Sequence, residues 1–263
     1  MTFIIAEAGV CHNGKWETGL DLIDAAHQAG ADAVKFQCFS SQDLWKDDRI
    51  KHLELRDEAF IALAAHCKEV GIEFMCTPFG VREVEFLNPL VKRWKIASGC
   101  LQKRQLLEAV RKTHKPVILS TGMSDMLQIN MALGFLGYYY PAENLQPFTL
   151  LHCTSSYPCP VSEVNLASME VLKHHHGDRC QVGYSDHTRG IVIALAAVAR
   201  GASVLEKHLT MDRKQEGPDH KSSIEPDEFR IMVEAIRTIE KSIGVWEKKV
   251  RPSEEKTRKA WYP

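Results

Sequence analysis

The sequence predicts a single (β/α)₈ barrel, and three observations support that fold class. The chain has 263 residues, which is close to the ~250 residues typical of such a barrel. Short apolar runs rich in β-branched residues alternate with longer segments of helical period along its whole length. No Ser/Gly linker or low-complexity tract interrupts this alternation, which indicates one domain.

The apolar runs predict eight strands, because each is short and ends at a polar or turn-forming residue. We expect strands at 3–8, 33–37, 73–76, 93–96, 116–120, 148–152, 181–185 and 204–208. Six strand–helix pairs with insertions would instead form an open, doubly wound sheet. The first strand is followed by AGVCHNG and not by the GxGxxG turn of a dinucleotide-binding sheet, which favours the closed barrel.

The segments between these strands predict eight helices. We expect helices at 18–29, 56–70, 82–90, 104–113, 125–136, 165–174, 190–200 and 227–242. Gly30 and Gly71 stand where two of them would end, as C-cap glycines do. Pro226, Asp227 and Glu228 are typical of a helix start, with acids near its positive end.

Composition excludes several classes of protein. The chain has 44% hydrophobic and 25% charged residues and a net charge of −1, so it lacks the overall basic field expected of a nucleic-acid-binding or anionic-membrane protein. Its longest apolar stretch, 191–199, is too short to span a bilayer, and its start, MTFIIAEAG, does not read as a signal peptide. The 8 cysteines form no CxxC pair. We therefore expect reduced thiols and a cytoplasmic location.

Polar residues gather at the end of nearly every expected strand, where a buried parallel strand should be continuously apolar. In a barrel these ends meet on one face, which is where such enzymes place their active sites. Lys35 and Lys95, with hydroxyls from Thr77, Ser98, Ser120 and Ser185, suit an anion that carries both phosphate and carboxylate. Alternatively each lysine pairs with Glu7 or Glu206, and both arrangements can hold together.

Two histidines end consecutive expected strands. His187 and His208 would lie close enough to share one divalent metal such as Mn²⁺, Fe²⁺ or Zn²⁺ acting as a Lewis acid, or they are simply a hydrogen-bonded pair. The run His174, His175 and His176 precedes Gly177 and is interpreted as a solvated helix end. The tail 246–258 mixes both charges and is expected to be solvated.

With these residues in view, the chain resembles the sialic acid synthase (N-acetylneuraminate synthase) family, including its spore-coat polysaccharide relatives. The resemblance covers about residues 3–259 and rests on IIAEAGVCHNG, AGADAVKFQ, TPF, KIASG, ILSTGM, LLHCTSSYPCP, GYSDHT, LEKHLT and GPDHKSSIEP in that order. It implies a transferase that condenses phosphoenolpyruvate with the open-chain aldehyde of an N-acylated hexosamine, giving a 2-keto sugar acid and phosphate. It also implies a homodimer.

The resemblance assigns roles to individual residues. It implies that phosphoenolpyruvate is held by Lys35, Thr77, Lys95, Ser98, Ser120 and Ser185. His187 and His208 would bind the metal, usually Mn²⁺, with Mg²⁺ or Co²⁺ as alternatives. Glu7 would act as an acid or base near the reacting carbons. Gln37, Tyr157 and Asp219 would approach the sugar or the metal-bound water.

Three features depart from the family pattern. The loop that usually reads NHNG has Cys11 in first place, and Cys100 stands where a glutamate usually faces the sugar. The barrel is expected at 1–245, and the tail at 246–263 stops before the family's antifreeze-like domain. Two other functions therefore stay open: a Schiff-base aldolase using Lys35 or Lys95, and an altered barrel that binds a sugar acid or needs a partner chain.

Overall fold

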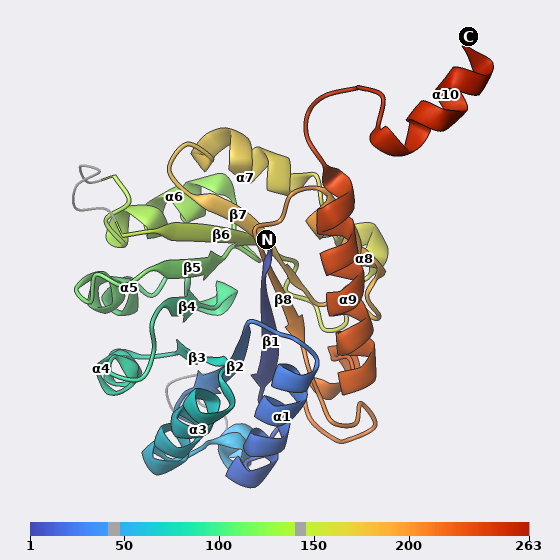
Figure 1. The fold of residues 1–263 in the computed structure, drawn as a ribbon. Coiled ribbons are helices and arrows are strands. Elements are labelled where there is room, and N and C mark those ends of the chain that lie inside the picture. The colour runs from blue at the N-terminus through green and yellow to red at the C-terminus, as the bar shows by residue number, and fades with distance from the viewer. Residues whose placement is uncertain (42–47, 140–145, 263) are drawn as a thin grey trace.

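Eight parallel strands form the barrel wall in a computed structural model, which describes residues 1–41, 48–139 and 146–262 (Figure 1). The strands are β1 (Phe3–Gly9), β2 (Ala33–Cys38), β3 (Glu73–Pro78), β4 (Trp94–Ile96), β5 (Val117–Ser120), β6 (Phe148–His152), β7 (Gln181–Asp186) and β8 (Val204–His208). Their order is β3-β2-β1-β8-β7-β6-β5-β4, and the two ends of this series, β3 and β4, lie against each other. The expected (β/α)₈ fold class is confirmed.

Helices follow the strands and form the outer ring of the barrel (Figure 1). They are α1 (Trp16–Gln28), α3 (Asp57–Val70), α4 (Val81–Leu87), α5 (Arg104–Arg111), α6 (Met126–Phe135), α7 (Ser168–His176), α8 (Val192–Ala199) and α9 (Pro226–Ile243). A further helix, α10 (Glu255–Trp261), lies beyond the barrel. Short 3₁₀ turns occur at η1 (Asp48–Leu53), η2 (Ser98–Cys100), η4 (Val161–Glu163), η5 (His220–Ser222) and η6 (Pro252–Glu254).

The main hydrophobic core lies between the strands and the helices, and a smaller one fills the barrel interior. Ile5, Met75, Ile118 and Leu151 belong to the small inner cluster, which leaves the opposite end of the interior to polar side chains. Alternation along a strand explains the division, because successive side chains point to opposite faces of the sheet. The polar ends of the strands therefore point into the barrel mouth.

The helix bounds agree with expectation to within a few residues, with one informative shift. Helix α7 starts at Ser168 and not at Asn165, because Asn165 has a positive φ of 47° that no helix accommodates. The helix also runs on to His176. His174 and His175 are exposed as expected, but His176 is buried against the ring of Tyr138, so the interpretation of all three as solvated is wrong for His176.

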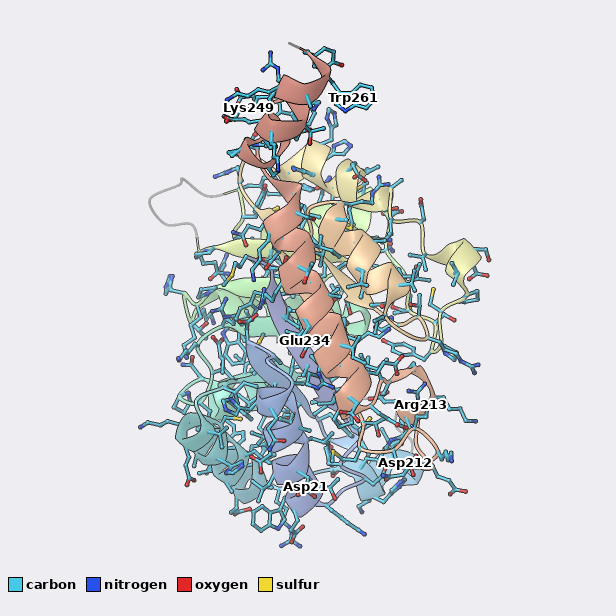
Figure 2. The ribbon with its side chains drawn as sticks, turned by 45° about the vertical axis from the view of Figure 1, so that its right-hand side comes forward. Asp21, Asp212, Arg213, Glu234, Lys249 and Trp261 are labelled. Atoms are coloured by element: carbon cyan, nitrogen blue, oxygen red, sulfur yellow. The ribbon has the colours of Figure 1, made fainter. Side chains whose placement is uncertain are left out.

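Helix α9 packs between α1 and α8 and leads into the C-terminal tail, which projects away from the barrel (Figure 2). Trp246, Trp261 and Tyr262 are exposed there, as expected for a solvated segment. All 8 cysteines are free thiols, and 7 are buried. Within the described parts of the chain, no helix is long and apolar enough to cross a membrane.

Candidate active site

A cluster of buried charges occupies the carboxyl ends of β1, β2, β4 and β8. Lys35 Nζ lies 2.6 Å from Glu7 Oε2 and 3.6 Å from Glu206 Oε2, and it donates a 3.1 Å hydrogen bond to Thr77 Oγ1. Lys95 Nζ lies 3.5 Å from Glu206 Oε1. Both lysines therefore pair with glutamates, which was one of the two arrangements foreseen, and both still lie at the barrel mouth.

Burial and charge act in opposite directions on these groups. Burial works against a charged Lys35, but Glu206 and Glu7 outweigh it and raise the pKa of that ammonium. For Lys95 burial dominates and lowers the pKa, because the attraction of Glu206, 3.5 Å away, is smaller than the effect of burial and is opposed by Lys35. Burial also opposes the charge of Glu206, yet the two lysines hold the pKa of its carboxyl well below its usual range. The cluster is thus a compact, nearly neutral set of charges shielded from water.

Hydroxyl groups and one backbone amide line the part of the mouth next to these lysines. Ser185 Oγ donates a 2.8 Å hydrogen bond to Glu206 Oε1. Ser98 Oγ accepts a 3.0 Å hydrogen bond from Gly122 N and lies 3.2 Å from Cys153 Sγ. Ser120 Oγ is buried and has no hydrogen-bond partner among the residues that the structure describes. A buried hydroxyl with an unused hydrogen-bonding capacity is a ready donor to an anion.

The two predicted metal ligands are neighbours. The rings of His187 and His208 have centroids 5.6 Å apart, and both side chains are about 5% exposed. His187 Nδ1 lies 2.7 Å from the Thr154 carbonyl oxygen, so Nδ1 carries the proton and donates it. The lone pair is then on Nε2, which lies 3.4 Å from Ser185 Oγ. The pKa of His187 is lowered to about 4, mainly by burial and to a smaller extent by the nearby His208, which keeps the ring neutral. Tyr157 covers this ring, with centroids 4.1 Å apart.

These histidines fit a divalent cation. Within the described part of the chain, His208 Nδ1 is buried without a hydrogen-bond partner and lies 3.7 Å from Asp219 Oδ2. A neutral imidazole whose far nitrogen is anchored on a carbonyl is the usual state of a metal-binding histidine. Over residues 1–41, 48–139 and 146–262, no group of three or more His, Cys, Asp or Glu side chains could hold a metal.

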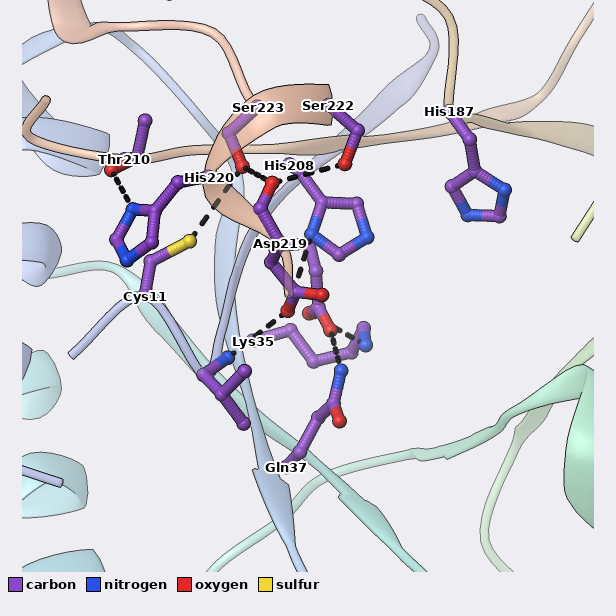
Figure 3. A network of polar contacts seen from close by, with 12 residues as sticks. Cys11, Lys35, Gln37, His187, His208, Thr210, Asp219, His220, Ser222 and Ser223 are labelled. Atoms are coloured by element: carbon purple, nitrogen blue, oxygen red, sulfur yellow. Dashed lines mark hydrogen bonds and ion pairs between the residues drawn. The ribbon is translucent and has the colours of Figure 1, made fainter. Parts of the chain in front are cut away.

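The loop after β8 brings Asp219 to the site (Figure 3). Asp219 Oδ2 accepts a 3.2 Å hydrogen bond from Val10 N, which ties this loop to the end of β1. The next residue, His220, is anchored by a 2.7 Å contact between its Nδ1 and Thr210 Oγ1. Gln37 Nε2 donates a 2.9 Å hydrogen bond to Glu7 Oε1 on the same side of the mouth. Local contacts thus hold each of these side chains in place.

The structure brings together the residues singled out from the sequence, and it adds Ser155. Ser155 Oγ is buried with no hydrogen-bond partner in residues 1–41, 48–139 and 146–262, and a Cβ added at Gly122 would collide with it. The sequence feature that could have identified Ser155 is its place in the polar run that follows β6. Glu206 was foreseen only as an ion-pair partner, but it lies between both lysines. Cys100 is fully buried in the main hydrophobic core and does not line an open subsite.

Comparison with known proteins identifies relatives of this chain. Residues 22–248 match the NeuB family. N,N'-diacetyllegionaminic acid synthase of Campylobacter jejuni is 42% identical over 275 residues, covering 97% of this chain and 81% of that protein. Human N-acetylneuraminate-9-phosphate synthase is 34% identical over 272 residues, covering 96% of this chain and 74% of that protein.

A solved structure has the same fold over nearly the whole chain. The crystal structure of an N-acetylneuraminic acid synthetase from Leptospira borgpetersenii, in complex with citrate, superposes with a TM-score of 0.90 at 35% identity. The match covers 98% of this chain and 90% of that one.

Proposed function

Because this chain belongs to the NeuB family of sialic acid synthases, which are phosphoenolpyruvate-condensing transferases, we propose that it joins phosphoenolpyruvate to an aldose of the N-acylhexosamine type. The products are a nonulosonic, sialic-acid-like 2-keto sugar acid and inorganic phosphate. The observation that carries the proposal is the buried Lys35–Glu206–Lys95 cluster beside two neighbouring histidines at the barrel mouth.

Phosphoenolpyruvate would bind where positive charge and unpaired donors meet. Lys35 and Lys95 supply the charge, and the hydroxyls of Thr77, Ser98, Ser120 and Ser185 supply neutral hydrogen bonds. The free Ser155 hydroxyl adds a further donor. Charge-assisted hydrogen bonds in a site shielded from water are stronger than those at a surface, so this set can orient an anion that carries phosphate and carboxylate.

His187 and His208 would hold the divalent cation, which we propose to be Mn²⁺, with Mg²⁺ or Co²⁺ as alternatives. When bound, the cation would draw electron density from the carbonyl of the aldehyde as a Lewis acid. His187 contributes a neutral Nε2, because its Nδ1 is committed to the Thr154 carbonyl. Asp219 Oδ2, 3.7 Å from His208 Nδ1, would orient the sugar or a nearby water.

The reaction then requires one new carbon–carbon bond, the addition of one water and the loss of phosphate. The methylene carbon of phosphoenolpyruvate attacks the aldehyde carbon, and the aldehyde oxygen takes a proton to become a hydroxyl. Water adds to the resulting cation and gives up one proton; the hydroxyl that it forms loses the second proton, to phosphate, as the carbon–oxygen bond to phosphate breaks and the keto group forms. Glu7 accepts one hydrogen bond from Gln37 and contacts Lys35, so its carboxylate is held in place and would take a proton of the attacking water. Tyr157 lies over His187 at the open side of the mouth, where it would contact the sugar.

We also propose that the barrel ends near residue 245. Helix α9 ends at Ile243 and the following residues are exposed, which supports that boundary.

A further proposal is that the chain forms a homodimer. Light scattering on a sizing column measures the oligomeric state. A mass of one chain, 29.7 kDa, would contradict the dimer.

One observation favours a second candidate, a Schiff-base aldolase. Burial lowers the pKa of Lys95, which increases the share of its amine in the neutral, nucleophilic form. Borohydride reduction in the presence of a keto acid would trap such an intermediate on Lys95. No trapped adduct is expected if Lys95 binds phosphoenolpyruvate instead.

The deciding experiment measures phosphate release from phosphoenolpyruvate with Mn²⁺ and a panel of aldoses. Phosphate release that depends on one aldose, with a new 2-keto acid in equal amount, supports the proposal. Binding of phosphoenolpyruvate without phosphate release for every aldose would favour an altered barrel that binds a sugar acid or needs a partner chain.

A further inference from the structure

A fully buried ion pair lies on the outer side of the barrel wall, directly behind the two histidines. Lys207 Nζ lies 2.8 Å from Asp186 Oδ2, and neither side chain is exposed to solvent. The two residues are register partners on β7 and β8, at Asp186↔Lys207. They point away from the barrel interior, because Ser185 and Glu206 beside them belong to the charge cluster in the mouth.

Most side chains between the strands and the helices are apolar, and the hydroxyls of Tyr184 and Thr188 near this pair are hydrogen-bonded to Asp186. Stability alone does not explain a fully buried ion pair there. Asp186 and Lys207 lie in the region where strands pack on helices, next to Tyr184 of the main core. Removing two charges from water costs about as much free energy as their attraction returns. Replacement of such a pair by apolar side chains of similar size is often neutral or stabilising. The remaining advantage of the pair is that it fixes the positions of the residues around it.

The contacts of the pair enclose the backbone of His187. Lys207 Nζ also donates a 2.5 Å hydrogen bond to the Thr188 carbonyl oxygen. Asp186 Oδ1 accepts hydrogen bonds from Thr188 N at 2.9 Å and from Thr188 Oγ1 at 2.8 Å. Residues 186 and 188 are therefore both fixed, and His187 is the single residue between them.

The same lysine fixes the second histidine, because Lys207 directly precedes His208 on β8. One side chain thus links the backbone of His208 to the segments on both sides of His187. Other contacts of His187 do not involve the pair: its Nδ1 reaches Thr154, its carbonyl accepts from Cys159 N at 2.9 Å, and its Nε2 lies 3.4 Å from Ser185 Oγ. Ser185 in turn donates to Glu206 on β8 inside the barrel mouth. The Asp186–Lys207 pair is a second link to β8, on the outer side of the wall, and it acts on the backbone on both sides of His187.

We propose that Asp186 and Lys207 are positioning residues that set the spacing between His187 and His208 for a divalent cation. The inference rests on the proposed metal-binding role of the two histidines. It assigns no contact with substrate or cation to the pair itself. Partners behind metal-binding side chains typically change metal affinity about 10–100-fold when they are removed.

The test uses the double variant Asp186→Leu with Lys207→Met, which replaces the pair by apolar side chains and leaves no buried charge unpaired. Mn²⁺ affinity is measured from the electron paramagnetic resonance signal of free Mn²⁺, on the wild type and the variant. We expect the dissociation constant for Mn²⁺ to rise about 10–100-fold. The thermal stabilisation by phosphoenolpyruvate should stay close to that of the wild type, because Lys35 and Lys95 are untouched.

The matched control replaces another ion pair, at the opposite end of the barrel. Arg93 Nε lies 2.8 Å from Glu73 Oε1 at the start of β3 and just before β4, far along the strands from the histidines. Glu73→Leu with Arg93→Met should leave Mn²⁺ affinity unchanged. An equal loss of Mn²⁺ affinity in both double variants would show a general effect on the barrel and would overturn the proposal.

The remaining outcomes are also decisive. Unchanged Mn²⁺ affinity in a folded Asp186→Leu/Lys207→Met protein overturns the positioning role while leaving the proposed function intact. If that protein does not fold, Asp186→Asn, which keeps the size of the side chain, must still weaken Mn²⁺ binding for the proposal to stand. Absence of Mn²⁺ binding in the wild type would instead overturn the metal role, and with it this inference.

Discussion

Ser185 Oγ donates a 2.8 Å hydrogen bond to Glu206 Oε1 across the ends of two adjacent strands, and it holds that carboxylate between Lys35 and Lys95. An incoming anion therefore meets two ammonium groups whose charge is already balanced. The position of Glu206 has two consequences: it keeps the lysines charged in a buried site, and it limits how tightly an anion binds.

Replacing Glu206 by glutamine should strengthen anion binding. Glutamine has nearly the same shape and can still accept the hydrogen bond of Ser185, but it removes one negative charge next to both lysines. We expect the affinity for inorganic phosphate to rise about tenfold, which corresponds to ~1.4 kcal/mol. Isothermal titration calorimetry measures this affinity. Weaker phosphate binding by a folded Glu206→Gln protein would show that Glu206 mainly keeps the lysines charged.

Replacing Lys95 by methionine should weaken phosphoenolpyruvate binding. A hydrogen bond to a charged group contributes ~1.5–3 kcal/mol, so the dissociation constant should rise about 10–100-fold. Thermal shift measurements over a range of phosphoenolpyruvate concentrations give this constant. Lys92→Met is the control, because Lys92 is an exposed residue before the start of β4. If phosphoenolpyruvate stabilised both variants equally, Lys95 would not contact the anion, and phosphoenolpyruvate would bind elsewhere.

Particular residues show why most of this site, but not all of it, could be predicted from the sequence. Glu7, Lys35 and His208 end strands of a parallel barrel, and topology alone brings strand ends to one mouth. No comparable rule predicts from the sequence where the side chain of a loop residue points. Ser155 was therefore missed, and the burial of Cys100 was not foreseen.

Local backbone conformation accounts for the shift in helix bounds. The hydrophobic period continues through Asn165, but its positive φ of 47° delays the start of α7 to Ser168. Asparagine tolerates this conformation better than most residues. A periodic pattern alone does not reveal which asparagine adopts it.

Replacing His208 by alanine should abolish tight binding of one divalent cation. His208 and His187 are buried neighbours, and removal of either leaves a single imidazole. Mn²⁺ titration and metal analysis after dialysis measure the loss, and EDTA should lower the melting temperature of the wild type but not of His208→Ala. His175→Ala is the control, since His175 is exposed at the end of α7. Full retention of the cation by His208→Ala would show that the two histidines of the wild type are a hydrogen-bonded pair and not metal ligands.

The stability of the fold should fall as the solution becomes acidic, in part through His12. Burial lowers the pKa of His12 from 6.5 to about 4, and its Nδ1 accepts a 3.0 Å hydrogen bond from Gly14 N. The folded state favours the neutral ring, so the unfolded chain binds the proton first. Stability is then complete above pH 6.5 and decreases down to about pH 4, by about 3 kcal/mol at most for this one group.

Urea unfolding of His12→Asn between pH 4 and 7.5 isolates this contribution. Asparagine offers an oxygen to Gly14 N but does not titrate in this range. The variant should therefore lose less free energy of unfolding than the wild type as the pH falls from 6.5. His187, whose pKa is also lowered to about 4, keeps part of the pH dependence in both proteins. Parallel curves for wild type and variant would show that His12 does not contribute.

The last prediction concerns Cys100, at the position where the resemblance to the family implies a glutamate. The Cys100 side chain is fully buried in the main core, and burial raises the pKa of its thiol. A carboxylate at this position would lose its hydration, with Lys103 and Lys95 as the nearest cations and both already engaged, Lys103 by the Phe79 carbonyl. Burying a charge without a partner is among the most destabilising single changes.

We therefore expect Cys100→Glu to lower the free energy of unfolding by more than ~2 kcal/mol, without improving turnover of N-acetylmannosamine. Cys100→Ala, the matched control, should cost less, because it leaves only a small cavity. Urea unfolding and phosphate release with phosphoenolpyruvate, Mn²⁺ and N-acetylmannosamine measure the two effects. If Cys100→Glu were as stable as the wild type and turned over this sugar faster, position 100 would face the sugar subsite. The acceptor of the wild-type chain would then have to be a sugar that needs no carboxylate there.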